Sequence, residues 1–205
     1  VIGNPIEHSL SPKLHNHWIK KNNIDAIYEK KQINETDIRE IISEVRNGKI
    51  DGINVTVPFK QSVIPFIDEL SSVANQAQSV NTIYKENNKI LGHNTDVSGF
   101  ELAIRGKGYD IKNKKLFILG GGGVVPSIIL ALRKMGAAKI ILSNRTKKKA
   151  EKLKNFFSDL EIVDWGETPE FNIIINATSL GLNKEDEIKL DYADLGPNKL
   201  FYDVI

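Results

Sequence analysis

The second half of the chain alternates short apolar runs with helix-like segments. The apolar runs are residues 116–119, 140–142, 162–163, 173–175 and 200–205. None of these runs alternates with polar residues, which is typical of parallel strands that are buried on both faces. Between the first two runs, residues 126–135 predict an apolar helix that ends at Gly136. The pattern predicts a series of β-α-β units, as in a doubly wound nucleotide-binding domain.

The first half has a more mixed pattern. Helices are predicted at residues 11–22, 36–47 and 61–70, and strands at 26–30 and 52–57. Ser11 is expected as the N-cap of the first helix, with Pro12 in its first turn, and Gly48 ends the second. Residues 82–84 and 90–92 flank the polar segment 85–89 and predict a hairpin. This half is therefore expected to be a separate α/β domain.

The strand at residues 52–57 leads into a lysine. Its alternating positions predict an apolar face formed by Ile53, Val55 and Val57. The other face carries Asn54 and Thr56, and Pro58 ends the strand. Lys60 then lies just past the strand end, where open α/β sheets usually bind ligands. Considered alone, Lys60 is more simply a turn lysine in solvent.

The two domains are predicted to meet near residue 97. A helix at residues 97–105, followed by Gly106-Lys107-Gly108, connects them. We therefore expect one domain at residues 1–97 and a second at residues 98–205.

Composition excludes several classes of protein. The chain has 205 residues, 40% hydrophobic and 26% charged, as in a globular protein of one large or two small domains. A net charge of +2 argues against a general nucleic-acid or membrane-surface binder, and residues 147–149 are expected on a solvated helix face. The absence of cysteine excludes disulfides, thiolate catalysis and zinc–thiolate sites. No apolar run approaches the roughly 20 residues of a membrane span, and we expect a cytoplasmic protein.

A glycine-rich loop follows the first strand of the second half. Its residues 120–123 are all glycine and precede a helix, so backbone amides can face a pyrophosphate without interference from Cβ atoms. The alternative is a glycine-rich turn that binds nothing. Val125 stands where a third small residue is usual, and we expect looser packing of the helix on the sheet there.

The end of the next strand favours NADP over NAD. NAD sites usually carry an acidic residue roughly 20 residues past the glycine loop, and none is present at this place. Arg145 instead offers a planar cation suited to a 2′-phosphate, flanked by Asn144 and Thr146. Thr146 could equally be a helix N-cap.

Three further stretches, residues 9–11, 80–82 and 92–96, are rich in short polar side chains. Individually each is best explained as a cap or a turn. Together with Lys60 they supply hydroxyls, amides, a lysine and a carboxylate, a set that would suit a polyhydroxylated substrate.

These motifs resemble the shikimate dehydrogenase family and occur in the family's order along the whole chain. They are IGNPIEHSLSP at residues 2–12 with Asn16, NVTVPFK at 54–60, VNT at 80–82, NTD at 94–96 with Gly99, the glycine loop, NRT at 144–146 with Lys149, and NATSLG at 176–181. The resemblance implies reversible NADPH-dependent reduction of 3-dehydroshikimate to shikimate, a step towards aromatic amino acids. It also implies a substrate domain followed by a Rossmann-like NADP domain.

The resemblance also implies roles for individual residues. Lys60 and Asp96 would form the catalytic pair in the cleft between the domains, with no metal. Ser9 and Ser11 would bind the substrate carboxylate, and the ring hydroxyls would meet Asn54, Thr56, Lys60, Asn81 and Asp96. The NADP(H) residues would be Gly120, Gly121, Gly122, Gly123, Val124, Asn144, Arg145, Thr146, Lys149, Ala177, Thr178 and Ser179. An ordinary turn is the alternative for the last three.

Other functions stay open at this point. One alternative is a dehydrogenase that prefers quinate or uses NAD, and another is an NADP-binding paralogue without catalysis. A nucleic-acid-binding module has only residues 147–149 in its favour, and we expect a monomer or a homodimer that binds neither nucleic acid nor membrane. Family members continue past the Tyr202-Asp203-Val204 stretch with a tyrosine, a glutamine that contacts substrate and terminal helices, none of which is in this sequence. We therefore expect this chain, apparently truncated at both ends, to fold poorly or bind substrate weakly.

Overall fold

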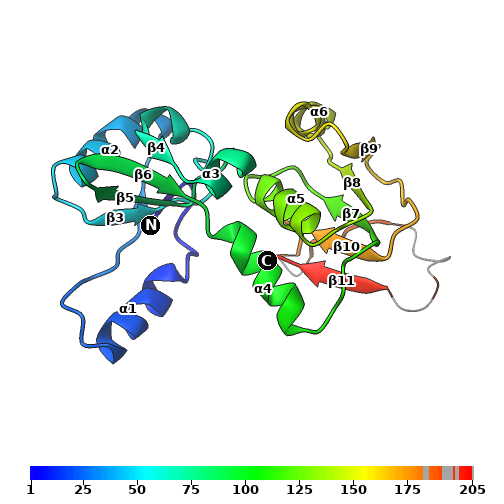
Figure 1. The fold of residues 1–205 in the computed structure, drawn as a ribbon, viewed down its shortest axis with the longest axis horizontal. Coiled ribbons are helices and arrows are strands. Elements are labelled where there is room, and N and C mark those ends of the chain that lie inside the picture. Colours follow the sequence, from blue (N-terminus) through cyan, green and yellow to red (C-terminus); the bar gives the residue numbers. More distant parts are fainter. Residues whose placement is uncertain (182–184, 191–195, 197–198, 205) are drawn as a thin grey trace. The chain divides into compact units, whose positions relative to one another are not determined.

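The computed structural model describes residues 1–181, 185–190, 196 and 199–204. The chain forms two compact units, residues 1–95 and 96–205, and each is described by itself (Figure 1). Within the described residues, no helix is both long enough and apolar enough to cross a membrane.

The second unit contains a five-stranded parallel sheet in the order β11-β10-β7-β8-β9. The strands are β7 (Lys115–Leu119), β8 (Lys139–Ser143), β9 (Glu161–Val163), β10 (Ile173–Asn176) and β11 (Leu200–Asp203). The chain runs outward from β7 to β9 and then returns to β10 on the other side of β7. Ligands of open α/β sheets bind where the strand order reverses in this way, at the carboxyl ends of the strands.

The strands of this sheet confirm the apolar runs predicted from the sequence. Leu116, Phe117 and Ile118 on β7 are fully buried, as are Ile173 and Ile175 on β10. The predicted last run overlaps β11, although the strand ends at Asp203 and Ile205 lies outside the described residues. Burial on both faces explains why the runs of β7, β8 and β10 show no polar alternation, whereas the edge strands β9 and β11 are half-buried or exposed.

Among the residues of the second unit that the structure describes, three segments form α-helices. They are α4 (Asp96–Gly106), α5 (Val125–Lys134) and α6 (Lys147–Phe156). Helix α5 packs beside α4 and is buried from Val125 to Leu132, which matches its continuous apolar sequence. Helix α6 buries only Ala150 and Leu153, and residues 147–149 are exposed as predicted. Val125 is fully buried, so the valine is accommodated inside the helix packing.

The first unit contains a four-stranded sheet in the order β3-β5-β6-β4 and a two-stranded parallel sheet, β1-β2. The strands are β1 (Ile2–Gly3), β2 (Lys31–Gln32), β3 (Gly52–Asn54), β4 (Glu69–Leu70), β5 (Thr82–Glu86) and β6 (Lys89–His93). The predicted hairpin is confirmed as β5 and β6, which are joined by Asn87 and Asn88 with φ of 47° and 62°. Asparagine tolerates this left-handed conformation, which tight hairpin turns require.

The helices of the first unit are α1 (Ser11–Lys21), α2 (Ile38–Arg46) and α3 (Ser72–Ala77). Helix α2 turns Ile38, Ile41, Ile42 and Val45 into the core of this unit. A 3₁₀ turn, η1 (Glu35–Asp37), precedes α2, so the predicted helix at 36–47 begins as a tighter turn. Helix α1 begins at Ser11 with Leu10 at the N-cap position, so the prediction of Ser11 as N-cap is wrong.

Two predicted elements of this unit are wrong. Residues 26–30 are not a strand, because Ile27 is 76% exposed and the Asn16 side chain binds the backbone N–H and C=O of Tyr28. Residues 61–70 are not an α-helix, because Pro65 lacks the N–H that a helix interior needs. This segment contains the 3₁₀ turn η2 (Ile64–Phe66) and β4. Helix α3, capped by the Ser71 side chain, was not predicted.

Candidate active site

The structure buries Lys60. Strand β3 ends at Asn54, a single bridge joins Val55 to Ile2, and Val57 is 54% exposed, so the predicted strand and its apolar face end early. The reason is that Thr56 N–H and Val57 C=O pair with residues 2–4 instead. Lys60 follows, only 8% exposed, and its carbonyl accepts a hydrogen bond from Val80 N–H at 2.8 Å. The alternative of a turn lysine in solvent is therefore excluded.

Asn54 and Asn81 are joined directly. The Asn54 Nδ2 atom donates to the Asn81 carbonyl at 3.1 Å and to Thr82 Oγ1 at 3.2 Å. Thr82 Oγ1 in turn donates to Asn81 Oδ1 at 3.0 Å. Strand β3 pairs with β5 at this end, which brings the two amides together at one edge of the sheet.

The side chain of Asn81 also holds the residue before Asp96. Its Nδ2 atom donates to Thr95 Oγ1 at 2.8 Å, and its Oδ1 atom accepts from Thr95 N–H at 3.0 Å. Asp96 follows Thr95 in the chain and is the first residue of α4, where a carboxylate is favoured by the positive end of the helix. The Asn81 side chain thus fixes both the backbone and the hydroxyl of Thr95.

The two serines lie at the start of α1. Ser11 N–H donates to Ser9 Oγ at 3.3 Å, and both residues are half-buried. Thr56 is also half-buried, and a Cβ on Gly3 would come within 2.6 Å of its Cγ2 atom. A side chain at position 3 would therefore force Thr56 and Ile6 to shift.

The glycine loop meets the loop after β10. Gly120 has a φ of 104°, and its N–H donates to the Ser143 carbonyl at 2.8 Å. A Cβ at Gly120 would lie 2.6 Å from the carbonyl oxygen of Ala177, whose own N–H donates to Leu119. The predicted cofactor residues on these two loops are therefore close together at the reversal point of the sheet.

Predicted phosphate ligands lie after β8. Arg145 and Lys149 are exposed at the start of α6, while Asn144 Nδ2 donates to the Thr146 carbonyl at 2.7 Å. Thr146 occupies the N-cap position without a capping hydrogen bond from its side chain. Lys147 pairs with Asp164 at 2.9 Å, and this hydrogen-bonded carboxylate raises the pKa of Lys147. Because Lys147 is engaged in this way, Arg145 and Lys149 are better placed to meet a phosphate.

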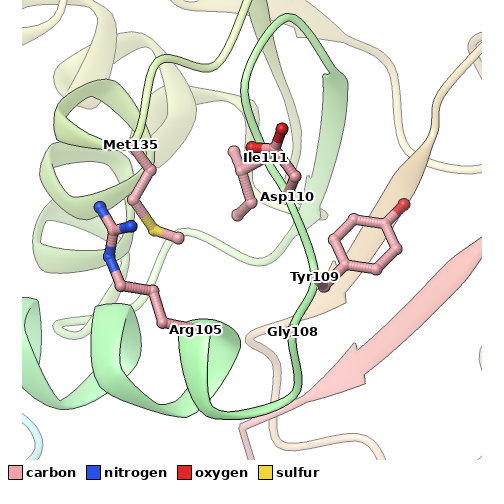
Figure 2. Close-up of a pocket in the computed structure, with 6 residues that line it drawn as sticks. All are labelled: Arg105, Gly108, Tyr109, Asp110, Ile111 and Met135. Atoms are coloured by element: carbon pink, nitrogen blue, oxygen red, sulfur yellow. The ribbon is translucent and has the colours of Figure 1, made fainter.

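A pocket of about 290 Å³ lies elsewhere in the second unit (Figure 2). Its lining comes from the end of α4, the connection to β7 and the residue after α5: Arg105, Gly108, Tyr109, Asp110, Ile111 and Met135. The pocket lies near the amino end of β7, whereas the glycine loop follows its carboxyl end. None of the predicted site residues lines it. Among the described residues, no cluster of His, Asp or Glu could hold a metal ion.

Two family models match the chain. Residues 1–83 match the model described as the shikimate dehydrogenase substrate binding domain, and residues 101–183 match shikimate / quinate 5-dehydrogenase. The chain belongs to the shikimate dehydrogenase family. This membership confirms the resemblance inferred from the motifs, and it confirms the predicted enzyme class, an oxidoreductase, at the level of the family.

Individual relatives agree with this assignment. The chain is 57% identical over 205 residues to the shikimate dehydrogenase (NADP(+)) of Pelagibacter ubique, covering 100% of this chain and 77% of that protein. The crystal structure of the Aquifex aeolicus shikimate dehydrogenase is 38% identical, with a TM-score of 0.89 over 100% of this chain and 77% of that chain. The Thermus thermophilus enzyme, solved with NADP(H) and shikimate, is 30% identical with a TM-score of 0.78 over 88% and 68%. The predicted fold class is confirmed.

Tyr28 contacts the candidate site of this shikimate dehydrogenase family member, although no sequence motif includes it. Its hydroxyl donates to Asn54 Oδ1 at 2.6 Å, and its ring stacks on His15 with centroids 4.2 Å apart. Burial raises the pKa of Tyr28, which keeps the hydroxyl protonated as a donor. The only sequence signal was Asn16 in the first motif, whose side chain fixes the Tyr28 backbone.

Proposed function

We propose that this chain catalyses the reversible NADPH-dependent reduction of 3-dehydroshikimate to shikimate. The observation that carries the proposal is the buried Lys60 beside the end of a sheet whose amides, Asn54 and Asn81, are held in a fixed network. Lysine is almost never buried without a specific partner or purpose. The choice of substrate and cofactor is supported by the names of the relatives and by the match of residues 1–83 to a substrate-binding domain.

Lys60 and Asp96 are the proposed catalytic pair. NADPH supplies a hydride to the substrate carbonyl carbon when bound, and the C=O electron pair moves onto the oxygen. That oxygen then takes a proton, which a protonated Lys60 can donate, and the reverse reaction returns the proton. Asp96 can orient the lysine ammonium and tune its pKa. In this proposal Ser9 and Ser11 bind the carboxylate, and Asn54, Thr56 and Asn81 bind ring hydroxyls.

The second unit fits an NADP molecule. The backbone at Gly120 and Ala177 approaches so closely that only glycine is accommodated, as in loops that cradle a pyrophosphate. Arg145 and Lys149 are exposed cations at the start of α6, suited to a 2′-phosphate. We therefore assign substrate binding to the first domain and NADP(H) binding to the second. The remaining cofactor assignments are Gly121–Gly123, Val124, Asn144, Thr146 and residues 177–179.

The test measures the reduction of NADP by shikimate as an increase in NADPH absorbance. The variants are a matched pair, Lys60→Ala and Lys49→Ala, and Lys49 is an exposed lysine. We expect turnover that is lost in Lys60→Ala and retained in Lys49→Ala. If wild-type protein binds NADPH but turns over no shikimate, the catalytic proposal is wrong and a non-catalytic NADP-binding paralogue takes its place.

Quinate and NAD serve as parallel substrates in the same assay. They are included because the second family model names quinate, and because a Listeria monocytogenes relative, 28% identical, was solved with shikimate and NAD. Faster turnover with quinate or with NAD would favour the alternative of a dehydrogenase that prefers quinate or uses NAD. We expect shikimate and NADP to be preferred, because Arg145 stands where NAD sites usually have an acidic residue.

A further inference from the structure

The side chain of Asn176 organises the loop after β10. Its Oδ1 atom accepts from Thr178 N–H at 3.1 Å and from Thr178 Oγ1 at 2.7 Å. Its Nδ2 atom donates to the Leu180 carbonyl at 2.9 Å and to the Asp203 carboxylate at 3.2 and 3.3 Å. Thr178 Oγ1 also accepts from Leu180 N–H at 3.0 Å. These bonds use both amide hydrogens and both carbonyl lone pairs of Asn176.

The backbone of Asn176 is fixed by the sheet. Asn176 pairs in register with Leu119 on β7 and with Asp203 on β11. Its carbonyl accepts from Val204 N–H at 3.1 Å, and the next residue, Ala177, donates to Leu119 at 2.8 Å. The side chain therefore ties residues 177–181, the loop that lies against Gly120, to a backbone position that the sheet holds in place.

We propose that Asn176 is a positioning residue for the cofactor loop, with Asp203 as its anchor. Asn176 itself need not touch the cofactor: it holds Ala177, Thr178 and Ser179 in the shape that binds NADP(H), so the inference rests on the proposed function. The role requires an amide, because only an amide offers two donors and an acceptor at this point. A carboxylate at position 176 could not donate to the Leu180 carbonyl and would lie beside the negative charge of Asp203.

The decisive variants are Asn176→Asp, Asp203→Asn and the double variant. Asn176→Asp should weaken NADPH binding about tenfold or more, since it loses at least one hydrogen bond and gains a like-charge contact. The double variant should regain about threefold or more, because the amide introduced at position 203 can donate to the carboxylate introduced at position 176, and the like charges are gone. Asp203→Asn alone should bind NADPH nearly as well as wild type, since Asn176 can still donate to the new carbonyl.

The readout is NADPH fluorescence titration, which does not depend on turnover, together with separate KM values for NADP and shikimate. We expect the KM for NADP to rise while the KM for shikimate stays within about twofold. Asn172→Asp is the matched control just before the same strand. Asn172 acts there as an acceptor for Lys115 N–H at 2.9 Å, a bond that a carboxylate can keep.

The outcomes separate this inference from the proposed function. If wild type fails to bind NADPH, the proposed cofactor assignment is wrong. If wild type binds and Asn176→Asp binds equally well, or the double variant shows no recovery, Asn176 has no positioning role. Should Asn176→Asp fail to fold, Asn176→Ser removes the amide without adding charge. Its NADPH affinity then decides: a loss of about tenfold supports the inference, and unchanged affinity overturns it.

Discussion

Replacing Gly120 with alanine should destabilise the second unit strongly. The backbone φ of 104° is a conformation that only glycine adopts readily, and holding another residue there costs about 1–2 kcal/mol. The new Cβ would lie 2.6 Å from the Ala177 carbonyl oxygen and 2.8 Å from its carbonyl carbon. These are backbone atoms of a paired strand end, so they cannot rotate away, and overpacking of this kind costs about 1–3 kcal/mol. Together the two effects cost about 2–5 kcal/mol.

Gly122→Ala is the matched control in the same loop. Its Cβ would lie 3.9 Å from the nearest atom, again the Ala177 carbonyl oxygen, which is an ordinary contact, and its φ is not in the left-handed range. Removing backbone freedom at such a site is neutral or stabilising by about 0.4–1 kcal/mol.

Urea unfolding without cofactor compares the two variants. We expect Gly120→Ala to lower the midpoint clearly, and a loss of about 3 kcal/mol would lower the melting temperature by about 6–12 °C in a chain of this size. Gly122→Ala should keep its midpoint and yet bind NADPH more weakly, because its methyl group would meet the pyrophosphate. Equal midpoints for the two variants would refute the argument that Ala177 excludes a side chain at position 120.

Three further predictions concern single side chains. Tyr28→Phe removes the 2.6 Å hydrogen bond to Asn54 and should raise the KM for shikimate about fivefold to tenfold, with the melting temperature changed by only a few degrees, as steady-state kinetics and thermal melts would show. Arg145→Gln should weaken NADPH binding about tenfold while leaving NADH binding unchanged in parallel titrations. Hydrogen bonding to Arg46 lowers the pKa of Asp68 from 3.8 to about 2, so this carboxylate stabilises the fold above about pH 4 and loses that effect as the pH falls towards 2. Asp68→Asn should flatten the dependence of the urea midpoint on pH in that window, and a slope equal to that of wild type would contradict it.

The second unit was largely predictable from sequence because its central strands, β7, β8 and β10, are buried along most of their length. Apolar runs such as residues 173–175 stand out from their surroundings, and each overlaps an observed strand. The first unit was harder to predict, because its strands are short and its edge segments depend on tertiary contacts. Residues 26–30 look like a strand, yet Tyr28 is bound by a side chain of α1 and not by a neighbouring strand. Pro65 argues against the helix predicted at residues 61–70, since proline is not tolerated in a helix interior.

The candidate site shows the same division. The position of Lys60 after a strand was readable from the sequence, but its burial and the hydrogen bond from Val80 N–H to its carbonyl join residues 20 positions apart. Asn176 was recognised as part of a motif, whereas its anchor Asp203 lies 27 positions away and meets it only because β10 pairs with β11. Contacts of this kind have no local signal in a single sequence.

The polar residues of the first unit act as one network, so their substitutions should not be additive. Tyr28 binds Asn54, Asn54 binds the Asn81 carbonyl, and the Asn81 side chain holds Thr95. Tyr28→Phe and Asn54→Ala remove the same hydrogen bond, so the double variant should raise the KM for shikimate by less than the product of the two single effects. By contrast, Tyr28 and Arg145 lie in different units and share no hydrogen-bond partner among the described residues. The effects of Tyr28→Phe and Arg145→Gln on the overall rate at low shikimate and NADP concentrations should therefore multiply. If the first pair multiplied as the second does, Tyr28 would not act through Asn54.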